Sequence, residues 1–484
     1  MNRSKLTTHK FNKGLFTTPF NSIGNIRINK WNYDRMPAYV WLGLIIKENG
    51  HKKGLEICFK IVKRIVDSKL GINFPTLNSI FNLSSENQEM LFKYISNQIN
   101  PKVLYPLTLI YPYTRQPIFN KYFNIVSETD DRHEELIAII EDTYNHQSEI
   151  SSDMRFIIVW SAVLTEQLKF QKDILIIEAL KNYADHRHED EIMKQYRPII
   201  RATEGVFGGA IENMFSNDFS NYFWKEISEM TKCKLYVVDV ADETDIENTT
   251  KFLKFLKDIV TYYEEFLRTF NPISIKAEVL LTIFIYSYKR ILELVNHNLY
   301  NEISGRTITR SIIENYIMMK YLVKEEENHT DIWSDYISYG LGQYKLIMSK
   351  YSDNENSPKN THLPVNYIEA ILTSETDQKF LNMDTRYFNK KSIREKAILV
   401  GEKELIDYYY DYDSQFEHGL WGALRESVSI VCDNPAHKYH HSLDIDNKQK
   451  HKSVWKDCKR VMIKSIDFLN SIYPLPEKAK KYEQ

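Results

Sequence analysis

Two groups of polar residues in the C-terminal half of the sequence have types and spacings that could support chemistry. Arg310 and Glu314 are four residues apart, so on a helix they share a face and can pair with each other. The second group combines a hydroxyl, an imidazole and a guanidinium in Ser414, His418 and Arg425. Phosphoryl and ester chemistry use such side chains, and a histidine can act as an acid, a base or a ligand near neutral pH. The sequence therefore predicts a catalytic or binding site built from these five residues.

The segment 306–324, which carries Arg310 and Glu314, is predicted to form a helix in the centre of its domain. Apolar residues occupy most of its circumference, which is typical of a helix with neighbours on every side. A charge buried there without a partner would destabilise the fold by several kcal/mol, so each member of the pair needs a partner. The side opposite the pair carries only apolar residues: Ile308, Ile312, Met319 and Val323.

The segment 403–432 is predicted to form a second long helix that presents the hydroxyl, the imidazole and the guanidinium on one face. Gly422 lies between His418 and Arg425 and would let a ligand approach closely. A structural alternative stays open for both helices. An Arg–Glu pair in a helical domain can serve only as a brace, to which a serine and a histidine then bond. The polar face of this segment at helical spacing is Asp411, Ser414, His418, Arg425 and Ser429.

The length and composition of the chain favour an all-α protein with two helical domains. The chain has 484 residues but only 15 glycines and 14 prolines, and turn-rich β folds use more of both. We expect an N-terminal helical domain over 1–232 that starts with a basic, partly extended segment. A linker over 233–248 and a C-terminal bundle of long helices over 249–484 follow. In the linker, the β-branched run 234–240 could form a strand, but no partner strand is evident.

The sequence gives no sign of export, of membrane insertion or of a cofactor. No apolar run is long enough to span a membrane, and no apolar signal core follows the first basic residues, so a cytoplasmic protein without a membrane partner is expected. The cysteines are widely spaced without a C-x-x-C pair, so neither a zinc site nor a disulfide framework is predicted. The cysteines are Cys58, Cys233, Cys432 and Cys458.

Three further segments are set aside as sites. The histidine-rich segment 185–190 is predicted to be a solvated patch, because neighbouring side chains on a helix point apart. The segment 437–441 is predicted to be a surface loop, in which His437 and His441 could share a metal ion only if it were helical. Residues 205–209 lack the lysine and the hydroxyl of a phosphate loop and are predicted to form a junction between helices.

The two ends of the chain are basic, although the whole chain has a formal net charge of −2. Residues 1–70 contain 14 Lys or Arg against 4 Asp or Glu, and residues 447–484 contain 10 against 4. Such ends could bind the phosphates of RNA or of a nucleotide. They could equally pack on the acidic middle of the same chain. A protein partner or a second copy of the chain is a further candidate.

The two polar groups also carry a resemblance to a bacterial family known as domain of unknown function 5677. The run Arg310-Ser311-Ile312-Ile313-Glu314, followed by Tyr321-Leu322, resembles the first signature of that family. The segments 394–401, 408–413 and 414–419 resemble its second signature, so the resemblance spans about 250 to 432. The segment Trp31–Trp41 is similar to an N-terminal extension of longer members, with Ala38 where those members usually have an acid. The resemblance implies an accessory role in mobile elements or phage defence.

These observations lead to one functional hypothesis and two alternatives. The first is a defence-related effector or toxin-like protein that binds RNA or a nucleotide. In its enzymatic form it would be a ribonuclease that acts through Arg310, Glu314, Ser414, His418 and Arg425. The second is a non-enzymatic helical sensor or complex subunit, in which the same residues are structural. The third is a metal-dependent hydrolase that uses His418 together with nearby acids.

Overall fold

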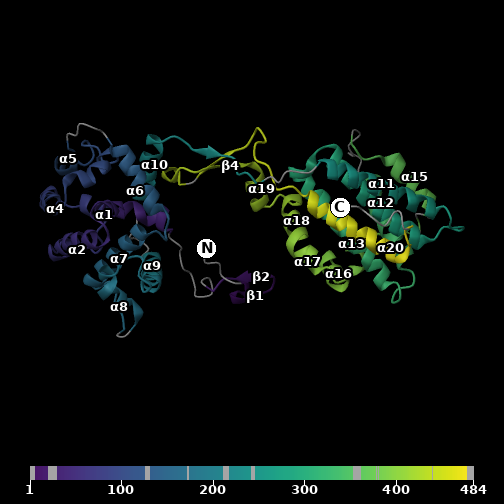
Figure 1. Cartoon of the computed structure of the whole chain (residues 1–484), viewed down its shortest axis with the longest axis horizontal. Helices are drawn as coiled ribbons and strands as arrows, with labels where there is room; N and C mark the ends of the chain where they lie inside the picture. The colour runs from purple at the N-terminus through teal and green to yellow at the C-terminus, as the bar shows by residue number, and fades with distance from the viewer. Residues whose placement is uncertain are drawn as a thin grey trace. The chain divides into compact units, whose positions relative to one another are not determined.

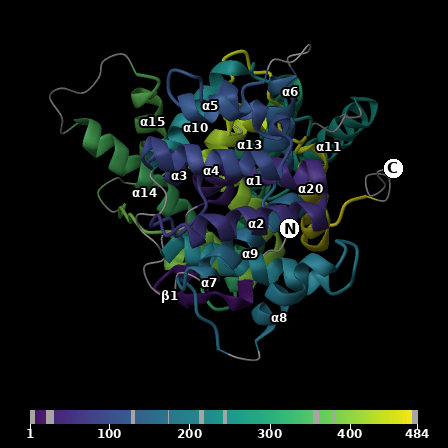
Figure 2. The same ribbon diagram turned by 90° about the vertical axis from the view of Figure 1, so that its left-hand side faces the viewer.

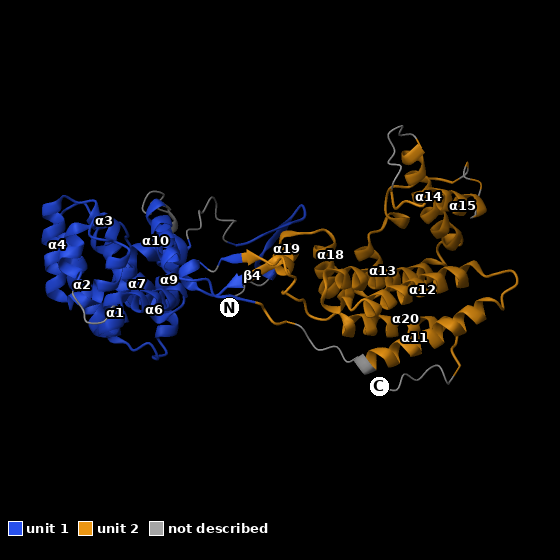
Figure 3. Ribbon diagram, turned by 90° about the horizontal axis from the view of Figure 1, so that it is seen from above, with its two compact units in different colours: residues 1–236, 431–441 blue, residues 237–430, 442–484 orange. Residues whose placement is uncertain are grey.

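A computed structural model of the chain describes residues 6–19, 30–125, 131–171, 174–210, 217–240, 246–352, 361–375, 377, 379, 381–438 and 440–476. Parts of both basic ends, and the acidic residues 241–245, lie outside these ranges. The chain divides into two compact units, coloured separately in Figure 3. Unit 1 comprises residues 1–236 and 431–441, and unit 2 comprises residues 237–430 and 442–484.

Nearly all of the described elements are helices, so the prediction of an all-α protein with two helical parts is confirmed. The strands are two to four residues long. Within the described ranges, no helix is both long enough and apolar enough to cross a membrane.

Unit 1 begins with an exposed hairpin of β1 (Lys10–Asn12) and β2 (Leu15–Thr17), followed by a π-helical turn over Trp31–Arg35. Figure 2 shows α1 running through the middle of the helices of this unit, and α1 packs against α2, α6 and α7. The helices are α1 (Met36–Asn49), α2 (His51–Asp67), α3 (Leu77–Phe81), α4 (Ser85–Gln98), α5 (Pro117–Phe123), α6 (Arg132–Tyr144), α7 (Glu149–Leu164), α8 (Leu175–Asn182), α9 (Met193–Ala210) and α10 (Asn217–Met230), with a 3-10 helix over Pro101–Leu109.

The sequence explains why α1 is central and α2 is not. Every residue of α1 from Met36 to Ile46 is buried, and Pro37 occupies its first turn, where a missing N–H breaks no helical hydrogen bond. In α2 the buried residues recur at helical spacing on one face, while lysines occupy the other face. Helix α1 therefore passes through the core, and α2 covers it.

A buried ionic group holds the N-terminal motif of unit 1 in place. Arg35 donates to both oxygens of Glu204 on α9, from Nε at 2.6 Å and from Nη2 at 3.0 Å. Arg155 of α7 lies 3.2 Å from the same carboxylate and stacks 4.4 Å from the ring centroid of Trp31. A Cβ on Gly208 would come within 2.8 Å of the Arg35 side chain, so a glycine is needed there. Gly208 belongs to the segment 205–209, which lies inside α9. The prediction of a helix junction over 205–209 is therefore wrong.

Unit 2 is a bundle of long helices around α13, as predicted, and Figure 1 shows α12, α13 and α20 running together. Its helices are α11 (Ile246–Leu267), α12 (Ile275–Asn296), α13 (Ile303–Glu325), α14 (Ile332–Ser352), α15 (Val365–Glu375), α16 (Ile393–Leu399), α17 (Lys403–Leu405), α18 (Asp411–Glu417), α19 (Trp421–Val428) and α20 (Trp455–Ile472). Helix α13 packs against α12, α16, α18 and α20, and most of its circumference is buried.

The prediction of one helix over 403–432 is wrong. A π-helical turn over Ile406–Tyr410 separates α17 from α18, and α18 ends at Glu417. Gly419 has a φ of +57°, a left-handed conformation that stops the helix before α19 begins at Trp421. The β-branched residues after α19 then form β4 (Ser429–Cys432). Because the helix is broken, the predicted polar face does not exist as one surface.

The run 234–240 contains a strand, as the sequence suggested, and its partner strand is β4. Strand β3 (Leu235–Tyr236) pairs with it in antiparallel register, with Leu235 opposite Cys432. Strand β5 (His441–Leu443) completes a sheet in the order β3-β4-β5. Between β4 and β5, a 3-10 turn over Pro435–His437 packs against α6 and α10, and its Ala436 belongs to the core of unit 1. The segment 431–441 thus completes unit 1 from far along the chain.

Candidate functional site

The structure brings three of the five predicted site residues together where α13 packs against α18. Arg310 lies 2.8 Å from Glu314, as their spacing predicts. The Arg310 Nε donates to the hydroxyl of Ser414 at 3.2 Å, and its Nη2 donates to the Tyr410 hydroxyl at 2.8 Å. Tyr410 in turn donates to Glu314 at 2.6 Å. Tyr410 is thus a fourth member of the group, and the sequence reasoning did not assign it to the site.

The charges within this group are balanced. Partial burial opposes the charge of Arg310, but the carboxylate of Glu314 and the contacts with Tyr410 together outweigh it and raise the pKa of Arg310. Burial, together with the hydrogen bond to Glu314, raises the pKa of Tyr410 to about 12, so its phenol keeps its proton at neutral pH. Ser414 donates its own proton to the backbone carbonyl of Tyr410 at 2.7 Å. The group therefore forms a closed set of hydrogen bonds around one guanidinium.

His418 and Arg425 lie apart from this group. His418 is the exposed residue that follows the last turn of α18, and Arg425 is exposed on α19. Among the described residues, the structure records no side-chain hydrogen bond or ion pair for either of them. The break at Gly419 places Arg425 on a separate helix, and His418 caps the end of α18. The imidazole and the guanidinium of the predicted set thus take no part in the hydrogen bonds around Arg310.

A pocket of about 760 Å³ opens onto the Arg310 group in unit 2, a volume typical of sites for small molecules. Its polar lining includes Arg310, Glu314 and Tyr410 on one wall and Lys396 of α16 on another. Glu278 of α12 adds a second carboxylate. The remaining lining is largely aromatic and aliphatic and comes from α12 to α15 and from the segments before and within α16. The aromatic members are Tyr286, Tyr336, Tyr339, Tyr344, Tyr387 and Phe388.

Lys396 is the unusual residue of this pocket. It is only 2% exposed, and its ammonium lies 5.3 Å from the ring centroid of Tyr321 and 5.5 Å from that of Phe388. Within the described part of the chain the structure records no hydrogen bond or ion pair for its ammonium, and the neighbouring carboxylate of Glu395 is held by Ser392. Burial, with a smaller effect of Lys391, lowers the pKa of Lys396 to about 8. Buried charges in proteins are normally paired with an opposite charge. The Lys396 ammonium has no such ion pair among the described residues.

Several tyrosines of the pocket present free aromatic faces. Tyr286, Tyr344 and Tyr387 are 54%, 42% and 69% exposed, and no other ring of the described residues stacks on them. Tyr336 and Tyr339 pack against Phe388 instead, at 5.3 and 5.5 Å between ring centroids. The pocket thus combines one unpaired cation with exposed aromatic rings.

One protein family matches the segment of the chain that forms most of this pocket. Residues 279–437 match the family of unknown function DUF5677. The resemblance predicted for the C-terminal half is therefore confirmed. Searches of curated proteins and of solved structures found no match. The DUF5677 segment contains the whole Arg310 group together with Lys396. The description of the family assigns no activity, so a function has to be argued from the site itself.

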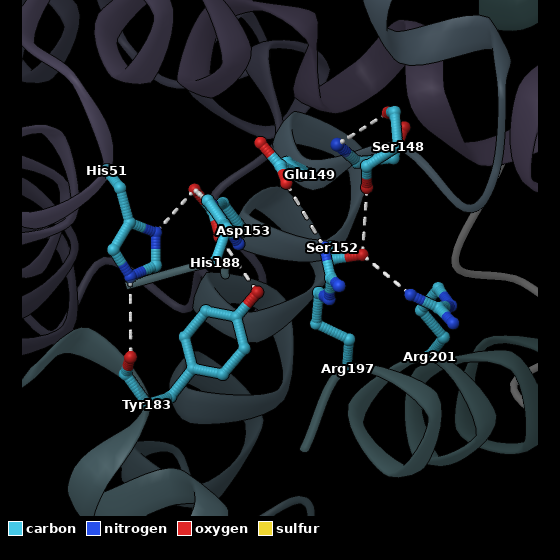
Figure 4. Close-up of polar contacts among 10 residues, drawn as sticks. His51, Ser148, Glu149, Ser152, Asp153, Tyr183, His188, Arg197 and Arg201 are labelled. Carbon is cyan, nitrogen blue, oxygen red and sulfur yellow. Dashed lines mark hydrogen bonds and ion pairs between the residues drawn. The ribbon is translucent and has the colours of Figure 1, made fainter. Parts of the chain in front are cut away.

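Side chains that could hold a metal ion form two clusters within the described residues, and both lie in unit 1. One consists of His51, Asp153 and His188, and Figure 4 shows the first two pointing at each other. The other consists of Cys233, Cys432, His437 and His440. The sequence reasoning had assigned His188 and His437 to solvated surface. His437 is buried, and the side chain of His188 is only 10% exposed.

Hydrogen bonds hold the first cluster together, although the Nδ1 of His188 has no partner among the described residues. The two ring nitrogens of His51 contact the Oδ2 of Asp153 at 2.8 Å and the carbonyl of Tyr183 at 3.3 Å. Asp153 also accepts from the Tyr183 hydroxyl at 2.8 Å, and His188 Nε2 lies 3.3 Å from it (Figure 4). Burial opposes the charge of His51, but the hydrogen bond and the charge of Asp153, with smaller effects of backbone hydrogen bonds, together outweigh it and raise the pKa of His51. Both ring nitrogens of His51 are used, so this cluster fits a hydrogen-bonded brace.

The sequence held weak signals for what was missed. Lys396 and Tyr410 both lie in segments that carry the family resemblance, 394–401 and 408–413. Nothing in the local pattern shows that Lys396, a lysine near the start of a short helix, would line a pocket. His51, Asp153 and His188 come from three segments that only the tertiary fold brings together.

Proposed function

We propose that unit 2 binds a nucleotide in the pocket beside Arg310 and Lys396. The observation that carries this proposal is the Lys396 ammonium, which is buried, borders the pocket and lacks an anion. A ligand phosphate would supply the missing charge. Phosphates are bound in proteins by such lysines and by arginines.

The rest of the pocket favours a ligand that has a flat ring as well as a phosphate. Tyr286, Tyr344 and Tyr387 offer exposed aromatic faces in the same lining, and nucleobases stack on such faces. Glu314 and Asn315 line the same cavity and could accept hydrogen bonds from a base or a ribose. A volume of about 760 Å³ suits one nucleotide rather than a folded RNA.

The geometry favours binding over catalysis. A ribonuclease would need a proton acceptor that faces the substrate's 2′-hydroxyl or a water, and His418, the histidine of the predicted set, does not line the pocket. The Glu314 carboxylate is held by Arg310 and Tyr410. These contacts support the sensor alternative, in which nucleotide binding is read out by another part of the protein or by a partner. A cytoplasmic defence sensor is the biological setting that the family resemblance suggests.

Calorimetric titration of the full chain tests the proposal. The ligands are the four common nucleoside 5′-monophosphates, with adenosine as a ligand without phosphate and ribose 5-phosphate as a ligand without a base. We expect at least one monophosphate to bind more tightly than both partial ligands. Lys396→Met should weaken that binding by about 10- to 100-fold, because a hydrogen bond to a charged group contributes about 1.5–3 kcal/mol.

Lys390→Met is the matched control, because Lys390 is an exposed lysine of the preceding segment that does not line the pocket. It should leave the affinity unchanged. Equal loss in both variants would mean that general charge, and not the pocket, attracts the ligand. Failure of all four monophosphates to bind would overturn the proposal. Lys396-dependent binding of an RNA oligomer, without binding of any monophosphate, would replace it with an RNA site.

A further inference from the structure

Four potential metal ligands converge in unit 1, from segments about 200 residues apart in the sequence. Cys233 precedes β3, Cys432 ends β4, His437 ends the 3-10 turn after β4, and His440 follows it. The antiparallel register of Leu235 with Cys432 brings the two chain segments side by side. Two further bonds extend the pairing: the Asp433 N–H donates to the Lys234 carbonyl, and the Asn434 amide donates to the Lys232 carbonyl.

We propose that Cys233, Cys432, His437 and His440 form a structural zinc site. Their ligand atoms all lie within 4.8 Å of one another. The sulfur of Cys233 is 3.5 Å from His437 Nδ1 and 3.4 Å from His440 Nε2, and the sulfur of Cys432 is 3.7 Å from His437 Nδ1. A tetrahedral zinc ion with Zn–S of about 2.3 Å and Zn–N of about 2.0–2.1 Å separates a sulfur from a nitrogen by about 3.5 Å. The three distances match that geometry.

Hydrogen bonding alone does not account for this arrangement. A thiol has one proton to donate and its sulfur accepts only weakly, yet the Cys233 sulfur faces a nitrogen on each of two imidazoles. The Nδ1 of His437 in turn faces two sulfurs. A single ion at the centre satisfies all of these contacts at once, with two thiolates that balance its charge.

The outer contacts of His437 favour the metal-binding form of its ring. The Nε2 of His437 lies 2.7 Å from the Thr231 hydroxyl and 3.1 Å from the Thr231 carbonyl. The carbonyl can only accept, so Nε2 carries the proton and Nδ1 presents its lone pair to the two sulfurs. Metal-binding histidines commonly donate their second N–H to a carbonyl in this way.

The site would be structural, because protein atoms supply all four ligands and leave no position for water or substrate. Cys432 and His437 are buried, and the neighbouring Ala436 belongs to the core of unit 1. The Tyr33 hydroxyl donates to the Lys438 carbonyl at 2.6 Å, which anchors the segment a second time. The ion would therefore fasten segment 431–441 to the end of α10. Cys233 and His440 lie outside the DUF5677 segment, so that segment alone does not supply the site.

Metal analysis of the full chain tests this inference. Protein purified with a reductant and without a chelator should contain about one zinc ion per chain by inductively coupled plasma mass spectrometry. Cys233→Ser and His440→Ala should each reduce the zinc content to near zero. His441→Ala is the matched control, since His441 is adjacent in sequence but outside the cluster, and it should keep the zinc.

A second measurement avoids variants that fail to fold. Replacement of zinc by Co²⁺ in the unaltered chain should give the visible absorption and the sulfur-to-cobalt charge-transfer bands of a tetrahedral thiolate–imidazole site. The absence of both zinc and a cobalt spectrum would overturn the inference. So would zinc that persists in both ligand variants, or a Cys233–Cys432 disulfide in protein kept under reducing conditions.

Discussion

Replacement of Lys396 by methionine should stabilise the protein without ligand. Methionine keeps an apolar chain of similar length in a site that is 2% exposed, but it removes the ammonium. In the folded state the pKa of this lysine falls from 10.5 to about 8. Since tenfold in proton affinity corresponds to about 1.4 kcal/mol, the buried charge costs about 3 kcal/mol at neutral pH.

Two effects make the stabilisation by Lys396→Met smaller than the cost of the buried charge. The ammonium borders an open pocket, so solvent screening brings the cost of its burial closer to about 2 kcal/mol. The variant also loses the contacts of the ammonium with the rings of Tyr321 and Phe388, which contribute about 0.5–1 kcal/mol each. The expected net change at pH 7 is a stabilisation of up to about 1 kcal/mol.

The assay is urea unfolding of both proteins across pH. A lowered lysine pKa means that the unfolded chain binds the proton more tightly. The penalty is therefore complete below about pH 8 and disappears as the pH rises toward 10.5. The advantage of Lys396→Met should shrink over that interval. A saturating anionic ligand should cancel the advantage at pH 7, because the wild type then gains its missing partner.

Destabilisation by Lys396→Met at pH 7, or a difference that does not depend on pH between 8 and 10, would refute this reasoning. Either result would mean that the ammonium already has a compensating partner. Lys390→Met serves as the control, and its stability should follow that of the wild type at every pH.

Four further predictions follow from the contacts in the two units. His418→Ala should leave nucleotide affinity in the calorimetric titration unchanged, because His418 does not line the pocket; a marked loss would restore it to the site. His51→Gln should lower the urea midpoint more below pH 6.5 than at pH 8. The raised pKa of His51 means that its protonated form stabilises the folded state, and this stabilisation is lost as the pH rises through the folded pKa. Equal effects at both pH values would contradict the hydrogen-bonded brace of His51 and Asp153. Glu204→Gln should lower the free energy of unfolding in urea by about 3–5 kcal/mol, since it leaves buried Arg35 and Arg155 without their carboxylate. A loss under about 1 kcal/mol would contradict burial of these ion pairs. A chelator should lower the Tm of the wild type but not of Cys233→Ser, and equal shifts would count against the zinc site.

The sequence predicted what depends on local periodicity. The apolar circumference of 306–324 correctly indicated a central helix, and the four-residue spacing correctly paired Arg310 with Glu314. Both results follow from the geometry of one helix, which the order of side chains determines.

Features that depend on a break in periodicity, or on distant segments, were not predicted. The segment 403–432 has helical spacing throughout, yet the left-handed Gly419 interrupts the helix between α18 and α19. The cysteines looked unrelated because almost 200 residues separate Cys233 from Cys432. Only the pairing of β3 with β4 joins them, and each strand alone is too short to give a clear signal.

The order in which the ribosome makes the chain gives the segment 431–441 one more consequence. Residues 1–236 emerge first, yet the strand and turn that complete unit 1 follow only after the intervening residues 237–430. At about 5–20 residues per second, that interval takes about 10–40 s. During this time the edge of β3 and the thiol of Cys233 have no native partner, so nascent unit 1 is vulnerable to mispairing and to oxidation until translation passes His440. A chaperone that binds the nascent chain would be most needed in this interval.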